Sequence, residues 1–483
     1  MSIASALGNA VSGLTASSRM AEVVSSNIAN AMTQGYARRE LSLSAETLGG
    51  EGGGVRINGV NRVVNASLLQ DKRLADAAAA NTSAKTAFHS RVETQIGDPN
   101  TEGSLSWTIS EFENSLLSAA SMPDSTTRLT AVASAASTVA DKLNAISEDL
   151  QATRLKADQS ITKQVRILNE TLAQVQEMNR TITTQISVGN DATGLMDARQ
   201  SLIDQISEIV PLRVVQRDNN QVALFTKGGA ALLDGSAIEV DFEGAGVMAP
   251  GYSLSGGPLH GLTIDGIEVS STDSGPFGGG TLGAAFTVRD DLAPAAQTKL
   301  DAFAIDLMSR FQDASVVTAG QPGLFTDSDG TAYSATTPIG ISGRLRLNAA
   351  VDPAQGGQVW KLRAGLDATS EGAVSDAKLL NAMSDAMTTE RVPPASGGFG
   401  SSLRSVAGLG SDLLSFASSA RQSAELTGGY ATARQEALTE LALADGVDTD
   451  YEMQTLLVVE KAYAANAKVI QTIDAMLQEL LDL

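Results

Sequence analysis

The chain has 483 residues, enough for two to four domains with cores of their own. Its formal net charge of −21 argues against a nucleic-acid partner and against binding to an anionic membrane surface. It has no cysteine, which excludes disulfides and thiol chemistry. The first ten residues lack a basic segment and an apolar core, so no cleaved secretory signal is expected. No apolar run reaches the roughly 18 residues of a membrane helix.

Small and apolar residues recur every three or four positions near the N-terminus, which predicts a helix with a heptad seam. The seam consists of Ile3, Leu7, Ala10, Leu14, Ser17, Ala21, Val24 and Ile28. It is weak, because alanine and serine bury little apolar area. Asn30 and Gly35 are expected to end the helix. An extended segment is then predicted over residues 36–43, and a flexible glycine-rich loop over residues 49–54.

The C-terminal segment shows the same pattern with larger aliphatic side chains. Its seam consists of Leu456, Val459, Tyr463, Asn466, Ile470, Ile473, Leu477 and Leu480. A polar residue on such a seam, here Asn466, tends to fix the register of the helices. Heptad helices at both ends can pack within one chain or between subunits, and the pattern alone does not choose between these two possibilities.

The interior alternates between helical and strand-like segments. Amphipathic helices are predicted over residues 104–210, with breaks near 122–124 and 189–191, and further helices over 292–311 and 401–443. Short apolar runs separated by glycine-rich turns predict strands at 221–226, 237–242, 262–269, 344–347 and 358–362. The predicted fold class is therefore α+β and multidomain, with coiled-coil terminal helices and a helical bundle that carries inserted β-rich segments.

We expect three domains from this layout. Residues 1–60 with 446–483 are expected to form a terminal coiled-coil domain. Residues 61–316 with 399–445 are expected to form a mainly helical domain, with a β-rich segment near 212–288. Residues 317–398 are expected to form an inserted, β-rich outer domain.

No group of residues predicts an active site, a cofactor site or a metal site. The only histidines, His89 and His260, lie in unrelated contexts. The glycine-rich loop has neither the preceding strand nor the following Lys-Ser/Thr of a phosphate-binding loop. Residues 327–330, Asp-Ser-Asp-Gly, begin like a calcium loop, but the later acidic ligands are missing, so a turn is expected. We therefore predict that the chain is not an enzyme.

Residues 26–36 read Ser-Asn-Ile-Ala-Asn-Ala-Met-Thr-Gln-Gly-Tyr, and Arg38 and Arg39 follow. This segment resembles the N-terminal signature of flagellar rod, hook and hook-associated proteins, Asn-x-x-Ala-Asn followed by Thr-x-Gly-Tyr. Gln34 replaces the usual proline. Residues 460–470, Glu-Lys-Ala-Tyr-Ala-Ala-Asn-Ala-Lys-Val-Ile, resemble the closing helix of the same proteins, although residues 448–451 depart from the common Leu-Asp-Glu-Glu.

Three interior segments narrow the resemblance to the hook-associated protein 1 (FlgK) family. They are Ile-Gly-Asp-Pro at 96–99, Leu-Met-Asp-Ala-Arg-Gln at 195–200 and Arg-Asp-Asp-Leu-Ala-Pro at 289–294. One departure is Asn65, where the family commonly has aspartate. The resemblance implies a structural subunit of the bacterial flagellum, without cofactors, at the junction between hook and filament. Another hook or rod subunit is the first alternative, and an extracellular adhesin or hydrolase is the second.

The resemblance also implies where and with what the chain assembles. It predicts export by the flagellar type III apparatus and an extracellular location. The partners are copies of itself in a ring, the hook protein, the second hook-filament junction protein and an export chaperone. The residues predicted to bind these partners are Ile3, Leu7, Leu14, Val24, Ile28, Asn30, Gly35, Tyr36, Leu456, Val459, Tyr463, Asn466, Ile470, Ile473, Leu477 and Leu480.

Overall fold

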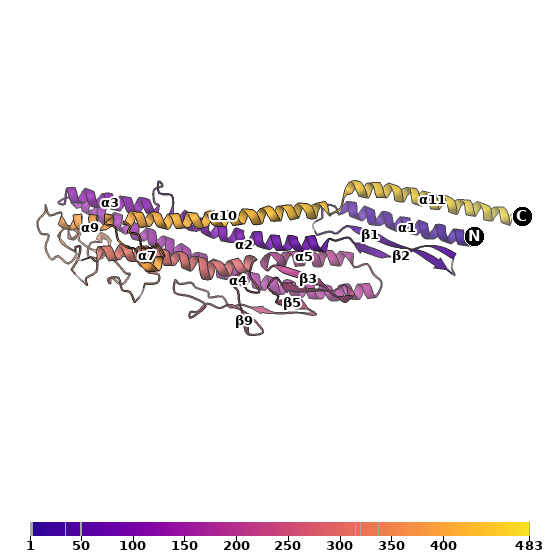
Figure 1. The fold of residues 1–483 in the computed structure, drawn as a ribbon, viewed down its shortest axis with the longest axis horizontal. Coiled ribbons are helices and arrows are strands. Elements are labelled where there is room, and N and C mark those ends of the chain that lie inside the picture. The colour runs from indigo at the N-terminus through magenta and orange to yellow at the C-terminus, as the bar shows by residue number, and fades with distance from the viewer. Residues whose placement is uncertain are drawn as a thin grey trace. The chain divides into compact units, whose positions relative to one another are not determined.

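The computed structural model describes residues 3–33, 35–48, 51–313, 315–318, 320–336 and 338–482, and it is mainly helical (Figure 1). The α-helices are α1 (Ile3–Ala29), α2 (Ala66–Ile96), α3 (Leu105–Ser121), α4 (Thr126–Ser187), α5 (Thr193–Ile209), α6 (Thr281–Thr287), α7 (Ala293–Phe311), α8 (Lys361–Ala364), α9 (Lys378–Thr388), α10 (Val406–Ala444) and α11 (Thr449–Leu481). The predicted α+β class is confirmed, because small antiparallel sheets accompany these helices.

The strands are short, apart from one long hairpin. They are β1 (Arg39–Leu48), β2 (Glu51–Arg62), β3 (Leu212–Gln216), β4 (Val222–Thr226), β5 (Ala231–Asp234), β6 (Ser236–Ala237), β7 (Val240–Asp241), β8 (Leu262–Ile264), β9 (Ile267–Val269), β10 (Phe325–Thr326) and β11 (Arg346–Leu347). Strands β3 to β6 form one antiparallel sheet in sequence order, and β7 to β9 form a three-stranded sheet in which β8 and β9 pair antiparallel. Strands β1–β2 and β10–β11 are antiparallel pairs.

The chain divides into two compact units. The first contains Met1–Ala80, Arg166–Val240 and Tyr430–Leu483, and the second contains Asn81–Val165 and Asp241–Gly429. The boundaries fall inside α2, α4 and α10, so each unit contains part of each of these helices. The three-domain division expected from the sequence stays a prediction.

In the first unit, α1 packs against α11 on one side and against the β1–β2 hairpin on another (Figure 1). Asparagine side chains on α4 bind the backbone of β4 and β7, strands of two different sheets. The Asn179 amide donates to the Val222 carbonyl at 2.9 Å and accepts from the Val222 N–H, and Asn169 makes the same pair of bonds with Val240. Such two-way bonds satisfy strand-edge groups that would otherwise be buried without partners.

The second unit has a continuous apolar core formed by α3, α4, α7, α9 and α10. Phe112, Phe311 and Phe325 pack together at its centre, with ring centroids 5.3 to 5.9 Å apart. Aromatic groups in these offset and edge-on arrangements contribute beyond their buried area. Because the core draws on segments from residue 88 to residue 417, it joins parts of the chain that are far apart in sequence.

A buried arginine lies at a π-helical turn, Val288–Leu292, that joins α6 to α7. Arg289 is fully buried and forms ion pairs with Asp158 at 2.7 Å and with Asp290 at 2.8 Å. Its guanidinium also donates to the His260 carbonyl and packs against the rings of Phe242 and Phe286. Arg289 therefore ties the segment after β7 to α4 and α7 within the second unit.

Most predicted helices are present. The breaks in residues 104–210 fall where expected, between α3, α4 and α5, and α10 matches the prediction closely. The helix predicted at 292–311 is confirmed as α7 (Ala293–Phe311), and the helical residues that precede it, in α6 and the π turn, were not predicted. Helix α2 was not predicted. Its larger apolar side chains follow helical spacing only at its end, at Phe88, Val92 and Ile96, and the remaining signal was its content of alanine and other good helix formers.

Several strand predictions need correction. The predicted strand at 262–269 is a hairpin, because Asp265 and Gly266 adopt positive φ and form its turn. The predicted strand at 358–362 is a turn followed by α8. In residues 317–398, the described strands β10 and β11 have two residues each, so this segment is not β-rich. Its apolar residues face the common core instead of one face of a sheet.

The glycine-rich loop prediction also needs correction. Gly49 and Gly50 lie outside the described residues, but residues 51–54 belong to β2 instead of a loop. Gly54 has a φ of 103°, and a Cβ built on it would lie 2.1 Å from Ser12 Oγ. Glycine is thus needed here for both the backbone conformation and the close approach of the hairpin to α1.

Candidate assembly surface

Helices α1 and α11 form an antiparallel pair within the first unit (Figure 1). Asp448 caps the start of α11 by accepting from the N–H groups of Asp450 and Tyr451 at 2.9 and 3.1 Å. Near the middle of the pair, Gly13 faces Asn466, and a Cβ on Gly13 would lie 2.9 Å from the Asn466 amide. The missing side chain therefore allows the two helices to approach closely.

The predicted seam of α1 largely faces inward. Val24 is buried, Leu7, Leu14 and Ile28 are half-buried, and Ile3 at the helix start is exposed. Ala16, Val23 and Asn27 form a second buried set on α1, which the heptad pattern did not include. Two buried faces are expected for a helix that contacts both α11 and the hairpin.

The predicted seam of α11 is only partly covered. Val459 and Ile473 are buried, while Leu456, Asn466 and Ile470 are half-buried. The remaining three seam residues are exposed, namely Tyr463, Leu477 and Leu480. The structure thus brings the two predicted seams together along part of their length, and the partner-binding role of these residues stays a prediction.

The N-terminal signature has a clear physical role around Asn27. This buried amide donates to the Arg39 carbonyl and accepts from the Arg39 N–H, both at 2.9 Å. It also accepts from the Tyr36 hydroxyl at 2.9 Å, and the Arg39 guanidinium lies over the Tyr36 ring at 4.8 Å. Asn27 therefore fixes the first residue of β1 against α1. It was not among the predicted site residues.

The other signature residues form the turn between α1 and β1. The Asn30 N–H and side-chain amide both donate to the Ser26 carbonyl, and the Thr33 N–H donates to the Asn30 carbonyl at 2.9 Å. Gly35 has a φ of 81°, a conformation that glycine adopts at little cost. Asn30, Gly35 and Tyr36 thus shape the chain reversal and are half-buried.

Carboxylates far away in sequence hold the emerging strand. Asp197 on α5 accepts from Arg39 Nη2 at 3.2 Å and from Arg62 Nε at 2.8 Å. Glu452 on α11 is buried and lies 3.8 Å from Arg38 Nη1. Neither carboxylate was predicted from the sequence to pair with these arginines, although Asp197 lies in one of the segments that carry the family resemblance.

The chain is similar to known flagellar proteins. Residues 89–323 match the family described as the flagellar hook-associated protein FlgK helical domain. Residues 7–36 match flagella basal body rod proteins, and residues 444–483 match the C-terminal segment of the flagellar basal body rod FlgEFG proteins. A flagellar hook-associated protein 1 of Bacillus subtilis is 24% identical over an alignment of 507 residues, covering 97% of this chain and 96% of that protein.

The chain is thus similar to flagellar hook-associated protein 1 along nearly its whole length, and residues 89–323 match the FlgK helical domain. The relative from Salmonella typhimurium is 25% identical over 241 residues, covering 48% of this chain and 43% of that protein. The structure of the flagellar hook junction protein FlgK from Burkholderia pseudomallei is 22% identical, with a TM-score of 0.43. The structural match covers 53% of this chain and 46% of the Burkholderia pseudomallei chain. The FlgK family is a family of structural flagellar proteins.

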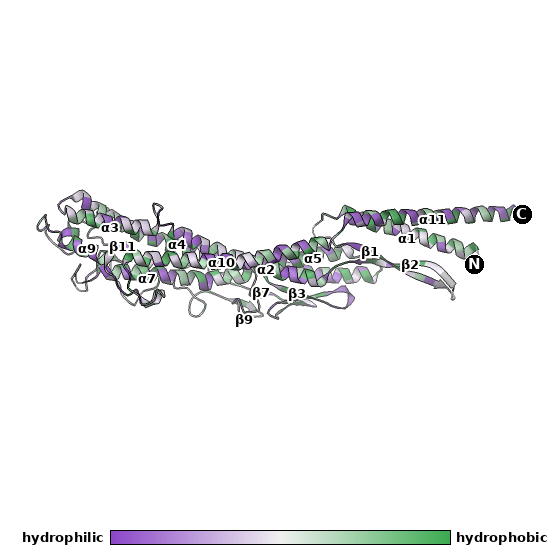
Figure 2. Cartoon of the chain, turned by 45° about the horizontal axis from the view of Figure 1, so that its top comes forward, coloured by the Kyte–Doolittle hydropathy of each residue, from purple (hydrophilic) through white to green (hydrophobic). Residues whose placement is uncertain are grey.

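In this chain, α11 carries a second apolar stripe beside the seam that contacts α1. The stripe consists of Val458, Ala462, Ala465, Val469 and Met476, spaced by four, three, four and seven residues. All five are exposed, with Val458 at 66%, Val469 at 44% and Met476 at 50%. Green segments accordingly recur along α11 in Figure 2. Ile3 and Ala6 of α1 line a shallow groove next to this stripe.

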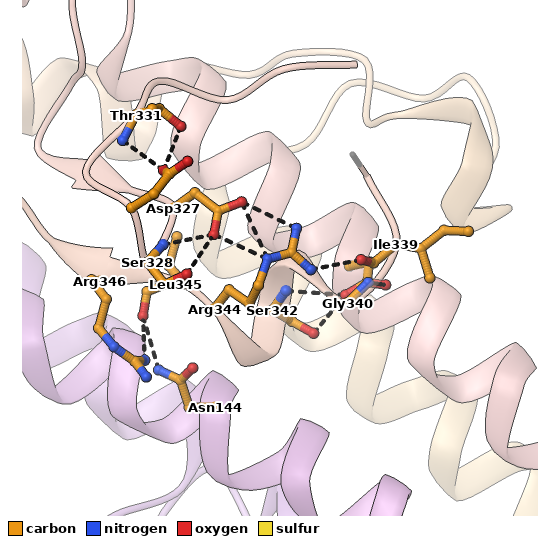
Figure 3. Close-up of polar contacts among 12 residues, drawn as sticks. Asn144, Asp327, Ser328, Thr331, Ile339, Gly340, Ser342, Arg344, Leu345 and Arg346 are labelled. Atoms are coloured by element: carbon orange, nitrogen blue, oxygen red, sulfur yellow. Dashed lines mark hydrogen bonds and ion pairs between the residues drawn. The ribbon is translucent and has the colours of Figure 1, made fainter. Parts of the chain in front are cut away.

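The Asp-Ser-Asp-Gly segment forms a turn in the second unit. Asp329 accepts from the Thr331 N–H and hydroxyl, at 2.9 and 2.6 Å. Asp327 pairs with Arg344 at 3.0 Å, and Arg344 also donates to the Ile339 carbonyl (Figure 3). These carboxylate oxygens are thus engaged by the chain's own donors. Among the described residues, no three acidic or histidine side chains are placed to hold a metal ion.

None of the helices in the described segments is both long enough and apolar enough to cross a bilayer.

Proposed function

We propose that the chain is a structural subunit of the bacterial flagellum at the junction between hook and filament. Two relatives that bear the name flagellar hook-associated protein 1 support this role, as does the helical-domain match over residues 89–323. The observation that carries the proposal is the exposed apolar stripe on α11. One copy of the chain covers only one side of this helix.

The stripe would be covered by the terminal helices of neighbouring subunits. Val458, Val469 and Met476 are all at least 44% exposed in the single chain. Burying a fully exposed side chain of this kind contributes about 1.5 to 3 kcal/mol, so covering the remaining exposed part of each would contribute roughly half of that. A ring of copies that buries the stripe and the exposed seam residues Tyr463, Leu477 and Leu480 would therefore gain considerable stability. The hook protein and the second junction protein would adjoin this ring.

The remaining parts of the proposal follow from the family resemblance. The chain would be exported by the flagellar type III apparatus without a cleaved signal, assisted by a chaperone, and would act outside the cell. Its role would be to bind and connect other subunits, not to catalyse a reaction. A hook or rod subunit is the nearest alternative, since both chain ends match rod families.

Deletion of the gene distinguishes these possibilities. If the chain joins hook to filament, the deleted cells should be non-motile, retain hooks and shed filament subunit into the medium. Cells without hooks would indicate a rod or hook subunit. Motile cells with normal filaments would contradict both.

The stripe itself is tested by complementation of the deletion. The double variant Val469→Lys, Met476→Lys places two charges on the stripe and should fail to restore motility. The matched control Gln471→Lys, Gln478→Lys adds the same charges at exposed positions elsewhere on α11 and should restore it. Equal motility of the two strains would refute the assembly role of the stripe.

A further inference from the structure

The first unit contains a cavity that is rich in arginine. It has a volume of about 1110 Å³ and lies among the β1–β2 hairpin, the start of α2, the end of α4, α5 and strands β3 and β4. Arg19, Arg62, Arg73 and Arg199 all line it, and Asp191 is its only acidic lining residue among those described. This concentration of positive charge contrasts with the net charge of −21 for the whole chain.

Two of these arginines are neutralised by acids within the unit. Arg62 donates to Asp197 at 2.8 Å, and Arg73 donates to Asp204 at 2.6 Å. Arg19 pairs with Glu22 near the surface, where both side chains are about half exposed or more. These three guanidinium groups therefore have a carboxylate partner.

Arg199 is different. It is only 5% exposed, and its Nη1 donates to two neutral oxygens, Asn179 Oδ1 and the Asn220 carbonyl, both at 2.7 Å. Within the described segments, no carboxylate pairs with it, and its Nε–H and Nη2–H groups donate to no residue. A buried cation without a counter-charge is costly, because removal from water is not offset by an attractive partner.

The surroundings of Arg199 increase this cost. Burial, and secondly the positive charge of Arg62, lower the pKa of Arg199 to about 10. The guanidinium still carries its charge at neutral pH. The guanidinium of Arg62, itself paired with Asp197, does not offset the charge of Arg199, so a carboxylate placed in the cavity would interact favourably with Arg199.

We propose that this cavity is a binding site for a carboxylate group from outside the first unit, with Arg199 as its main contact and Arg62 beside it. In the assembled flagellum, the carboxylate belongs to an acidic side chain of a neighbouring copy of the chain. This second statement rests on the proposed function. Composition favours that source, because the chain has 55 acidic residues against 34 lysines and arginines.

Binding is tested on the purified full-length chain by calorimetric titration at low ionic strength. The probes are glutarate and an N-acetylated pentaglutamate peptide. Arg199→Gln should weaken binding about tenfold or more, since a hydrogen bond to a charged group contributes about 1.5 to 3 kcal/mol. Arg199→Lys keeps the charge and should recover part of the affinity. Arg213→Gln, at an exposed position of β3 outside the cavity, is the matched control and should bind like the wild type.

Far-UV circular dichroism of each variant separates loss of binding from loss of folding. If Arg199→Gln unfolds, the affinities of the folded Arg199→Lys and Arg213→Gln variants still decide the matter. A wild-type chain that binds neither probe would overturn the site. Equal affinity of the wild type, Arg199→Gln and Arg199→Lys would overturn the role of Arg199.

Complementation of the gene deletion then distinguishes the source of the carboxylate. If a neighbouring copy supplies it, Arg199→Gln should restore motility poorly and Arg213→Gln fully. Normal motility of the Arg199→Gln strain, with binding of glutarate intact in the wild-type chain, would overturn the neighbouring-copy assignment and leave a free organic acid as the ligand. A deletion strain with normal filaments would refute the proposed function without affecting the binding result.

Discussion

Replacement of Arg289 by methionine is expected to destabilise the second unit strongly. The change removes a fully buried cation that pairs with Asp158 and Asp290 at 2.7 and 2.8 Å, and it leaves both carboxylates without their charge partner. Breaking a buried ion pair from one side typically costs about 3 to 5 kcal/mol. With a urea m-value of about 2 to 3 kcal/mol per M, the unfolding midpoint should fall by roughly 1 to 2.5 M.

Tryptophan fluorescence during urea unfolding measures this effect in the right place. Trp107 and Trp360 are the only tryptophans of the chain, and both belong to the second unit. The control Arg91→Met removes a partly exposed ion pair with Asp149, and it should change the free energy of unfolding by less than about 1 kcal/mol.

Neutralising the carboxylates as well should reverse part of the loss. Adding Asp158→Asn and Asp290→Asn to Arg289→Met removes the uncompensated charges, so the triple variant should be more stable than Arg289→Met alone. A midpoint for Arg289→Met within about 0.3 M of the wild type, an effect of at most about 1 kcal/mol, would refute the reasoning.

Three further changes test other features. Burial lowers the pKa of His89 in the folded chain below the unfolded value of 6.5. The unfolded chain therefore binds a proton at His89 more readily, and the free energy of unfolding decreases as the pH falls below 6.5 towards the folded pKa. His89→Gln should reduce this decrease between pH 7 and pH 5, measured by tryptophan fluorescence during urea unfolding. Asn27→Ala leaves the N–H and the carbonyl of Arg39 without their hydrogen-bond partner, so it should lower the stability of the β1–β2 hairpin by about 2 to 4 kcal/mol. The loss should be measured as faster amide hydrogen exchange in the hairpin. Tyr36→Phe removes one hydrogen bond and should cost only about 1 kcal/mol. Gly54→Ala meets both a positive φ and Ser12, so it should increase exchange at the Val55 amide, which donates to Ser12 Oγ; unchanged exchange would contradict the close packing.

The sequence predicted features that depend on local spacing. The three-and-four repeats located α1 and α11, and the breaks before Thr126 and Thr193 were visible as turn-forming residues. Helix α2 escaped this approach because its face is built from alanine, which has no strong apolar period. The hairpin of β1 and β2 was also missed as a pair, since its glycines indicate a loop until the approach to α1 is known.

The parts of the candidate site that escaped prediction depend on long-range partners. The sequence shows that Asn27 belongs to the N-terminal signature, but it does not show that the side chain binds the backbone of Arg39, twelve residues later. Asp197 lies more than a hundred residues from the two arginines that it binds, and Glu452 lies still farther from Arg38. A single sequence supplies no information on which of its many charges will meet.

The antiparallel pairing of α1 and α11 has a consequence for biogenesis. About 420 residues separate the end of α1 at Ala29 from the start of α11 at Thr449. During synthesis, α1 leaves the ribosome long before its partner exists, and closing so long a loop is slow compared with local folding. The second unit consists of Asn81–Val165 and Asp241–Gly429, so it is complete before α11 is made and can fold earlier. The apolar face of α1 therefore stays exposed until translation ends, and during this interval a chaperone could bind it.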